Sequence, residues 1–273
     1  MLRRLLNKIL AKSRQRDLSI IICSIDDQNF NCVAENYARQ LGDWPYELIR
    51  IDDATSLADG YNRGIERSNG ELLIFSHDDI EILTPDFCDR LFAHLESFDL
   101  IGVAGTSVLL NGRWISAGQP GIHGQVVQPV LTGEGFTLDV FGPENQPARG
   151  NIQALDGLFL ATRRWVAESL RFDAENFDGF HLYDIDFSYR VHLAGLRVGV
   201  CNDILIYHQS LGPTDDTWER YMKVFWNKFA GNLSVDPPGV QKLYVRERVR
   251  TKSEALALFQ QYLGQRGIVK FSR

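Results

Sequence analysis

The segment Gly70–Ile80, GELLIFSHDDI, joins an apolar run to a cluster of charged side chains. Its apolar residues 72–75 indicate a buried strand of a parallel sheet, because such strands are covered on both faces. The run ends abruptly in His77, Asp78 and Asp79. Ligands of open α/β sheets bind beyond the carboxyl ends of the strands. The segment therefore predicts either a divalent-ion site facing a diphosphate or an acidic start to a helix, and by itself it does not separate the two.

The composition is that of a globular protein with one large core, or one core and an appendage. The chain has 273 residues, of which 44% are hydrophobic and 23% charged. Its net charge of −6 gives no basic surface of the kind that binds nucleic acid, so we expect no nucleic-acid partner. The four cysteines are not spaced like zinc ligands, which predicts reduced thiols in a cytoplasmic protein.

Residues 1–16, MLRRLLNKILAKSRQR, form a basic amphipathic pattern. They lack the apolar core and cleavage site of a signal peptide, and no apolar run in the sequence approaches the roughly 20 residues of a membrane span. We expect a helix at 1–16 that packs on its own domain or on a partner. The alternative is peripheral contact with the inner face of a membrane.

Strand and helix patterns alternate along the first hundred residues. The strand patterns cover 18–23, 46–51, 71–76 and 100–104. The helix patterns cover 31–41, 57–70 and 84–98, the last with Thr84 as its N-cap. Strands separated by helices predict right-handed βαβ units around a parallel sheet.

The second half of the chain is less regular. Glycine and proline are frequent between Gly105 and Gly150, and we expect a partly ordered segment there that faces the substrate and closes over it. Strand patterns return at 155–161, 197–201 and 204–207, and a helix pattern covers 184–194. Beyond residue 212, two helices beginning near Asp216 and Thr251 carry apolar stripes that suit packing or contacts in an oligomer.

Acidic clusters follow the first three expected strands, at Asp26–Asp27, Asp52–Asp53 and 77–79. In a parallel sheet these strand ends share one rim, where carboxylates repel one another unless a cation or sugar hydroxyls lie between them. One cluster is compatible with a helix cap, but three together predict a site. A fourth acidic residue, Asp184, is either a cap or a positioned base, and its sequence context alone favours the cap. The chain has neither GxGxxG nor GxxxxGK[ST], which argues against a dinucleotide-dependent dehydrogenase and a P-loop NTPase.

Five segments in order resemble a family 2 glycosyltransferase with the GT-A fold: LSIIICSI, IDDATSLADGYNRGIERSNGELLIFSHDDI, ALDGLFLATRR, FHLYDIDFSYRVHLAGLRVGV and IYHQSLG. The resemblance covers about residues 17–212. It is greatest to a glycosyltransferase-like branch with His-x-Asp in place of Asp-x-Asp, which includes streptomycin-biosynthesis-type proteins. It implies an α/β, Rossmann-like domain with a mostly parallel sheet flanked by helices, followed by a C-terminal helical extension at 213–273.

The resemblance also implies a role for each matching residue. The positions that bind the nucleotide or lie beside the sugar are matched by Ser24, Asp26, Asp53, Asn62, Asp78, Asp156 and Gly157. The metal-binding positions are matched by His77, Asp79 and His208, and the base of inverting members by Asp184. Two residues depart from the usual pattern: His77 replaces an Asp, and Tyr183 stands where many relatives have Glu.

The expected function is that of a metal-dependent, inverting glycosyltransferase. Such an enzyme moves a sugar from a nucleoside diphosphate sugar to a hydroxyl of a glycan, a protein or a small molecule, with Mn²⁺ or Mg²⁺ as cofactor. Because of the two departures, a catalytically inactive GT-A domain that serves as a binding or assembly module stays open as the alternative. A nucleotidyltransferase is disfavoured, because the chain has no basic, glycine-rich phosphate loop.

Overall fold

The first sheet of the molecule is mostly parallel, as expected. The computed structural model describes residues 17–142, 145–210, 216–234 and 245–268, so the expected helix at 1–16 lies outside the described residues. The strands follow the order β2 (Tyr46–Ile51), β1 (Leu18–Cys23), β3 (Leu72–Ser76), β11 (Phe159–Arg163), β5 (Leu100–Gly102), β12 (Val198–Cys201) and β9 (Ala148–Arg149). Within this sheet β11 and β9 run against the other strands.

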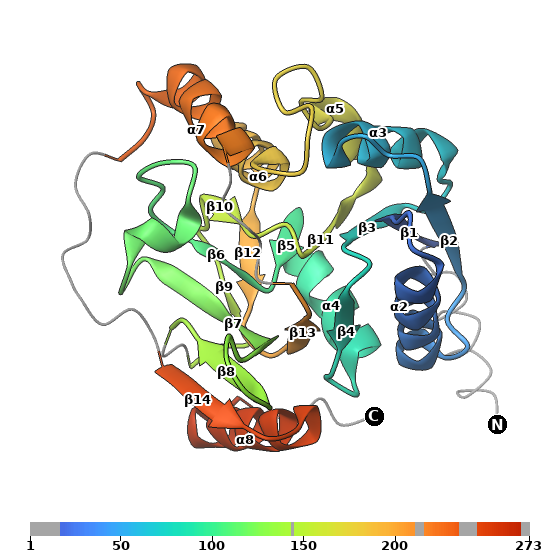
Figure 1. Cartoon of the computed structure of the whole chain (residues 1–273), viewed down its shortest axis with the longest axis vertical. Helices are drawn as coiled ribbons and strands as arrows, with labels where there is room; N and C mark the ends of the chain where they lie inside the picture. The colour runs from blue at the N-terminus through green and yellow to red at the C-terminus, as the bar shows by residue number, and fades with distance from the viewer. Residues whose placement is uncertain (1–16, 143–144, 211–215, 235–244, 269–273) are drawn as a thin grey trace, which may run out of the picture.

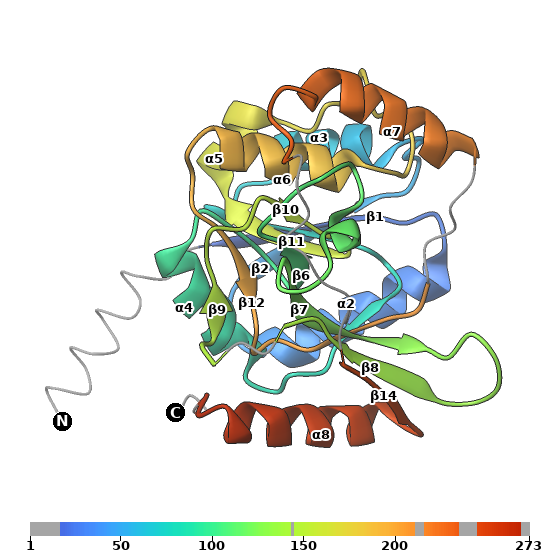
Figure 2. The same cartoon turned by 90° about the vertical axis from the view of Figure 1, so that its left-hand side faces the viewer.

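Helices cover both faces of this sheet, which makes the molecule layered (Figure 1). One face packs against α3 (Leu57–Arg67), α5 (Arg164–Leu170) and α6 (Tyr183–Leu193), and α7 (Asp216–Phe229) packs on the outer side of α6 (Figure 2). The other face packs against α2 (Asp27–Leu41) and α4 (Phe87–Ser97). Coverage on both faces explains the continuous apolar run of β1, in which Ile20, Ile21 and Ile22 are all fully buried.

A second sheet occupies much of the segment 105–150, which we expected to be partly ordered. Its strands follow the order β10 (Ala154–Leu155), β6 (Ala104–Thr106), β7 (Ile122–Pro129), β13 (Ile206–His208) and β4 (Ile80–Ile82), with β8 (Phe136–Val140) against β7 and β14 (Val245–Val249) against β8. The sequence pattern did not predict β7 and β8 themselves, whose Ile122, Val127 and Leu138 are fully buried. Gly124 obscured the pattern: its φ is +101°, and a Cβ there would lie 2.0 Å from the carbonyl oxygen of Val103.

Two helices begin at other residues than expected. α4 starts at Phe87 after Asp86, and Thr84 does not cap it; the Thr84 hydroxyl instead accepts the N–H of Leu205 at 2.8 Å. α2 starts at Asp27, because the Asp26 side chain accepts the N–H of Asn29 at 2.8 Å and so acts as its N-cap.

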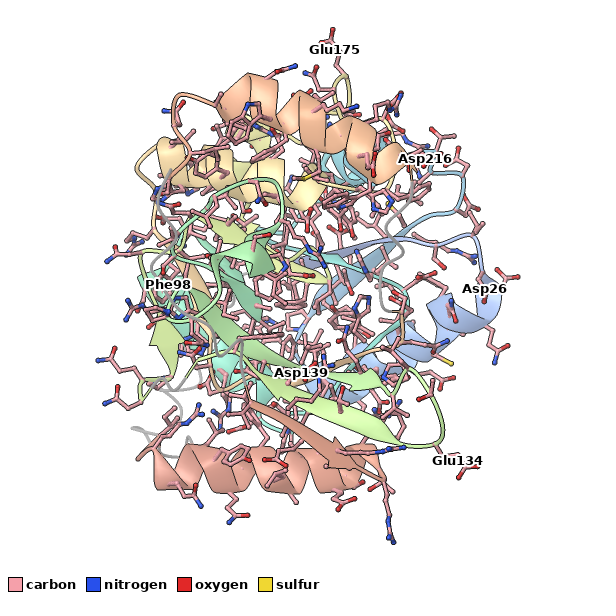
Figure 3. All side chains as sticks on the ribbon, turned by 60° about the vertical axis from the view of Figure 1, so that its left-hand side comes forward. Asp26, Phe98, Glu134, Asp139, Glu175 and Asp216 are labelled. Atoms are coloured by element: carbon pink, nitrogen blue, oxygen red, sulfur yellow. The ribbon has the colours of Figure 1, made fainter. Side chains whose placement is uncertain are left out.

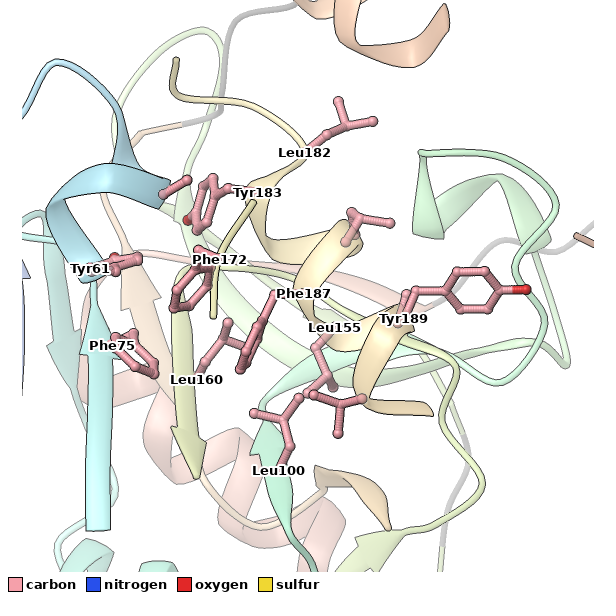
Figure 4. Packing of buried hydrophobic residues seen from close by; sticks show 14 of the residues in the cluster. Tyr61, Phe75, Leu100, Leu155, Leu160, Phe172, Leu182, Tyr183, Phe187 and Tyr189 are labelled. Atoms are coloured by element: carbon pink, nitrogen blue, oxygen red, sulfur yellow. The ribbon is translucent and has the colours of Figure 1, made fainter. Parts of the chain in front are cut away.

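An aromatic cluster fills the layer between the first sheet and α6 (Figure 4). The rings of Phe172 and Phe187 stack with centroids 4.3 Å apart, and Phe75 meets Phe172 edge-on at 4.9 Å. Tyr61 lies 5.1 Å from Phe75 and 5.7 Å from Tyr183. The start of α6 thus rests on a rigid, well-packed support.

The C-terminal extension contains a strand as well as the two expected helices. Tyr221, Phe225 and Phe229 of α7 are buried against the α6 layer, so this aromatic stripe is a packing surface. β14 was not expected; it pairs antiparallel with β8. α8 (Lys252–Gln265) begins at the predicted cap, where the Thr251 hydroxyl accepts the N–H of Glu254. Figure 2 shows α8 at the opposite end of the molecule from α7.

Two properties of the described residues bear on the composition analysis. All four cysteines are free thiols, as expected. Within the described ranges, no helix has both the length and the apolar character needed to cross a membrane.

Candidate functional site

Strand pairing brings the three expected metal ligands together. β3 ends at Ser76, and the chain then places His77, Asp78 and Asp79 before β4. β13 runs antiparallel to β4 and sets His208 directly opposite Ile80, the neighbour of Asp79. Two backbone N–H groups that follow His208 fix this junction, because Gln209 donates to the Asp79 carbonyl oxygen and Ser210 to its carboxylate.

The three side chains point their ligand atoms at a common point. His77 Nδ1 lies 3.3 Å from His208 Nε2 and 3.8 Å from Asp79 Oδ1, and His208 Nε2 lies 3.3 Å from Asp79 Oδ1. All three ligand atoms lie within 4.8 Å of one another. Burial, followed by the charge of His208, lowers the pKa of His77 to about 4. Burial raises the pKa of Asp79, but contacts with His208, His77 and Ser210 outweigh it and hold that pKa below its usual range. A neutral imidazole and an ionised carboxylate are the forms that ligate a metal.

A pocket of about 680 Å³ opens on one side of this group. Ser24 and Asp78, both expected at the nucleotide, line it together with His77 and Asp79. The Ser24 hydroxyl donates to Asp78 at 2.6 Å, and burial raises the pKa of Asp78. The volume and the polar groups at one end suit a ligand of nucleotide size.

Three of the expected nucleotide-binding residues do not reach this pocket. Asp26 lies at the outer end of α2, which it caps (Figure 3). The exposed Asp53 pairs with Arg63 at 2.7 Å. Both amide atoms of Asn62 bond to the backbone of Phe172, at 2.8 and 3.0 Å, so this side chain joins α3 to the segment before α6. Of the three acidic clusters, only the one at 77–79 is among the described residues that line the pocket.

A second pocket, of about 350 Å³, opens on the other side of His77. Asp156, Gly157 and Asp184 line it together. Asp184 does not cap α6, which begins after Leu182; its carboxylate accepts the N–H of Gly157 at 2.7 Å. Burial, and then the negative charge of Asp156, raises the pKa of Asp184 to about 7. A carboxyl with that pKa can exchange a proton near neutral pH.

The two pockets meet at His77, Phe180 and His181, which line both. A ligand in the larger pocket can therefore contact a ligand in the smaller one beside the His77, Asp79 and His208 group. Phe180 is 57% exposed at this junction.

Sequence reasoning missed Trp114 and Ser210 as members of the site. The indole N–H of Trp114 donates to Asp156 at 2.9 Å and holds this carboxylate in the smaller pocket. Ser210 contacts both His208 and Asp79, at 3.1 and 3.0 Å. Trp114 lies in the glycine-rich segment that we expected to face the substrate, but its partner Asp156 is far away in sequence, so the contact could not be predicted. Ser210 could have been found from its place two residues after His208.

With this geometry established, comparisons with known proteins assign the family. Residues 19–229 match the glycosyltransferase-like family, and the chain belongs to it. A protein from Fuscovulum blasticum described as ATP synthase subunits region ORF 6 is 25% identical over 170 residues, which cover 60% of this chain and 62% of that protein. The match therefore spans less than two thirds of that relative.

One solved structure identifies the fold as GT-A. TarS from S. aureus, residues 1–349 in complex with UDP, superposes with a TM-score of 0.50 at 11% identity, covering 91% of this chain and 70% of that chain. The mannosyltransferase PcManGT from Pyrobaculum calidifontis, in complex with GDP-Man and Mn²⁺, gives a TM-score of 0.49 at 12% identity over 92% of this chain and 73% of that chain. The expected fold is confirmed, and membership of the His-x-Asp branch stays a prediction.

Proposed function

We propose that this protein transfers a sugar from a nucleoside diphosphate sugar to an acceptor hydroxyl, with inversion at the anomeric carbon. The observation that carries the proposal is the junction of the two pockets at His77, between a group of three metal-ligand side chains and the carboxylate of Asp184. The larger pocket is assigned to the nucleotide donor and the smaller one to the acceptor, and membership of the glycosyltransferase-like family supports this assignment.

In the proposed mechanism each residue has one task. Ser24 and Asp78 bind the donor in the larger pocket. His77, Asp79 and His208 would hold a divalent ion, which would supply Lewis-acid stabilisation of the departing diphosphate. Asp184, held by the N–H of Gly157, accepts the proton of the acceptor hydroxyl as that oxygen attacks the anomeric carbon. No covalent intermediate with the protein is needed.

Of the two expected ions, the metal-ligand side chains favour Mn²⁺ over Mg²⁺. Mg²⁺ prefers oxygen ligands and keeps much of its water, whereas imidazole nitrogen suits first-row transition metals. Two of the three ligand side chains are imidazoles. We therefore expect tighter binding of Mn²⁺ than of Mg²⁺ at equal concentration.

The test is turnover of a panel of nucleotide sugars by the purified full chain. An enzyme should hydrolyse its own donor slowly in the presence of Mn²⁺, and it should consume that donor faster, by transfer of the sugar, when a matching acceptor is added. A binding or assembly module should shift its melting temperature with a nucleotide sugar and turn over none. Thermal shift with the same panel, with and without Mn²⁺, identifies which donors to assay.

A further inference from the structure

One buried side chain contacts the edge of the His77 ring that points away from the metal-ligand group. The hydroxyl of Tyr183 lies 2.7 Å from His77 Nε2, whereas His77 Nδ1 faces His208 and Asp79. We propose that Tyr183 is a positioning residue that holds the His77 ring with its Nδ1 lone pair directed at the metal site. This inference rests on the proposed function, because it presumes a metal ion at this site. The hydrogen bonds from which it is argued join residues of this chain only.

The hydrogen bonds around Tyr183 assign the His77 tautomer. The Tyr183 hydroxyl has one proton, which it donates to the carbonyl oxygen of Gly157 at 3.3 Å. It must then accept from His77, so the imidazole proton lies on Nε2 and the Nδ1 lone pair is free. His208 Nε2 lies within hydrogen-bond distance of His77 Nδ1 and of Asp79 Oδ1. Without a metal it carries the proton that is donated to these two atoms, and a bound metal ion would replace that proton. A partner that fixes the tautomer and orientation of a ligating histidine typically strengthens metal binding.

Tyr183 is held rigidly enough for this task. Its side chain is 3% exposed, and its ring packs 5.7 Å from Tyr61 and 6.2 Å from Phe172 (Figure 4). Leu182, just before it, has the positive φ of 58°, which is unusual for a leucine and turns the chain so that α6 starts at the site.

Gly157 makes the close approach of Tyr183 feasible. A Cβ at this position would lie 2.3 Å from the Tyr183 hydroxyl oxygen and 2.6 Å from the Asp184 Cβ. The same glycine accepts from Tyr183 through its carbonyl oxygen and donates to Asp184 through its N–H. One residue therefore positions both the ligand His77, by way of Tyr183, and the base on the acceptor side.

The test compares Tyr183→Phe with Tyr189→Phe in the full chain. Both tyrosines are buried in α6, and the Tyr189 hydroxyl bonds to the carbonyl oxygen of Asn232 at 2.8 Å, outside the site. Calorimetric titration with Mn²⁺ alone should give a dissociation constant that is about 10- to 100-fold weaker for Tyr183→Phe. Tyr189→Phe should bind Mn²⁺ as the wild type does.

A second measurement reads the tautomer without metal. Long-range ¹H–¹⁵N spectra of the metal-free protein should show the His77 proton on Nε2 in the wild type and in Tyr189→Phe, and a mixture of tautomers in Tyr183→Phe. Unchanged Mn²⁺ affinity in Tyr183→Phe, or an unchanged tautomer, would overturn the inference while leaving the proposed function standing. Failure of the wild type to bind Mn²⁺ would overturn the metal-dependent function and, with it, the role of Tyr183.

Discussion

The Nδ1 atom of His77 and the Nε2 atom of His208 lie 3.3 Å apart, although 131 residues separate them in the chain. The antiparallel pairing of β13 with β4 creates this proximity, and Asp79, just before β4, completes the group. At this distance one cation can contact both nitrogen atoms once neither of them carries a proton. The structural relationship leads directly to the first prediction.

Asp79→Asn should weaken Mn²⁺ binding by at least about tenfold, because it removes the negative charge from the ligand group while keeping the shape of the side chain. The fold should be preserved, since an amide can still accept the N–H of Ser210. Calorimetry with Mn²⁺ measures the effect. Asp53→Asn is the matched control: this aspartate is exposed and pairs with Arg63 outside the pocket. Equal affinities in the two variants would show that Asp79 is not a ligand.

Asp184→Asn should lower sugar transfer by at least about 10²-fold, the lower end of general-base contributions, and should leave nucleotide and Mn²⁺ affinity unchanged. The amide keeps the shape of the side chain and can still accept the N–H of Gly157, so the pocket stays intact. Initial rates with a matched donor and acceptor measure the loss. The control is Glu168→Gln, an exposed carboxylate paired with Arg164 at the start of α5. Full transfer by Asp184→Asn would place the base elsewhere.

The transfer rate should rise with pH between about 6 and 8, because the pKa of Asp184 is about 7 and only its ionised form accepts a proton. A rate measured at saturating substrates across this range tests the prediction. A flat profile would mean that a step other than proton transfer to Asp184 limits the rate.

The same raised pKa predicts a pH effect on stability. Because the folded-state pKa lies above the ordinary value of 3.8, the folded protein holds this proton more tightly than the unfolded chain does. The stabilisation is fully present below about pH 4 and is lost as the pH rises towards 7. The melting temperature of Asp184→Asn should therefore rise relative to that of the wild type from pH 5 to about pH 7 and then change no further. A constant difference between the two would contradict the raised pKa.

Asp186→Asn should destabilise the protein by about 3 kcal/mol, although Asp186 lies only two residues from Asp184. The Asp186 side chain is fully buried and pairs with Arg190 at 2.8 Å and Lys228 at 2.6 Å, which ties α6 to α7. Urea denaturation measures the change, and Glu168→Gln, which breaks an exposed i,i+4 pair, should cost about 0.5 kcal/mol or less. A loss for Asp186→Asn no larger than that of the control would mean that this ion pair does not secure α7.

Local patterns in the sequence determined the first layer of the structure. Strands β1 and β3 are marked by continuous apolar runs, and α3 by apolar residues at every fourth position. Such patterns depend only on neighbours within a few residues, so the sequence predicted which segments are strands and which are helices. The cap at Thr251 is local for the same reason. The candidate ligands His77 and Asp79 could also be predicted, because they directly follow an apolar strand whose carboxyl end must lie at the rim.

Tertiary structure alone decided the remainder. Aspartates serve equally well as helix caps and as ligands, so the sequence did not reveal that Asp26 caps α2 instead of lining the larger pocket. β7 and β8 are stabilised by pairing with each other and with distant strands, and their glycines and prolines concealed them. The contact between Tyr183 and His77 joins residues 106 positions apart. Hydrogen bonds and packing across such separations form only once the chain has folded, which is why local periodicity does not contain them.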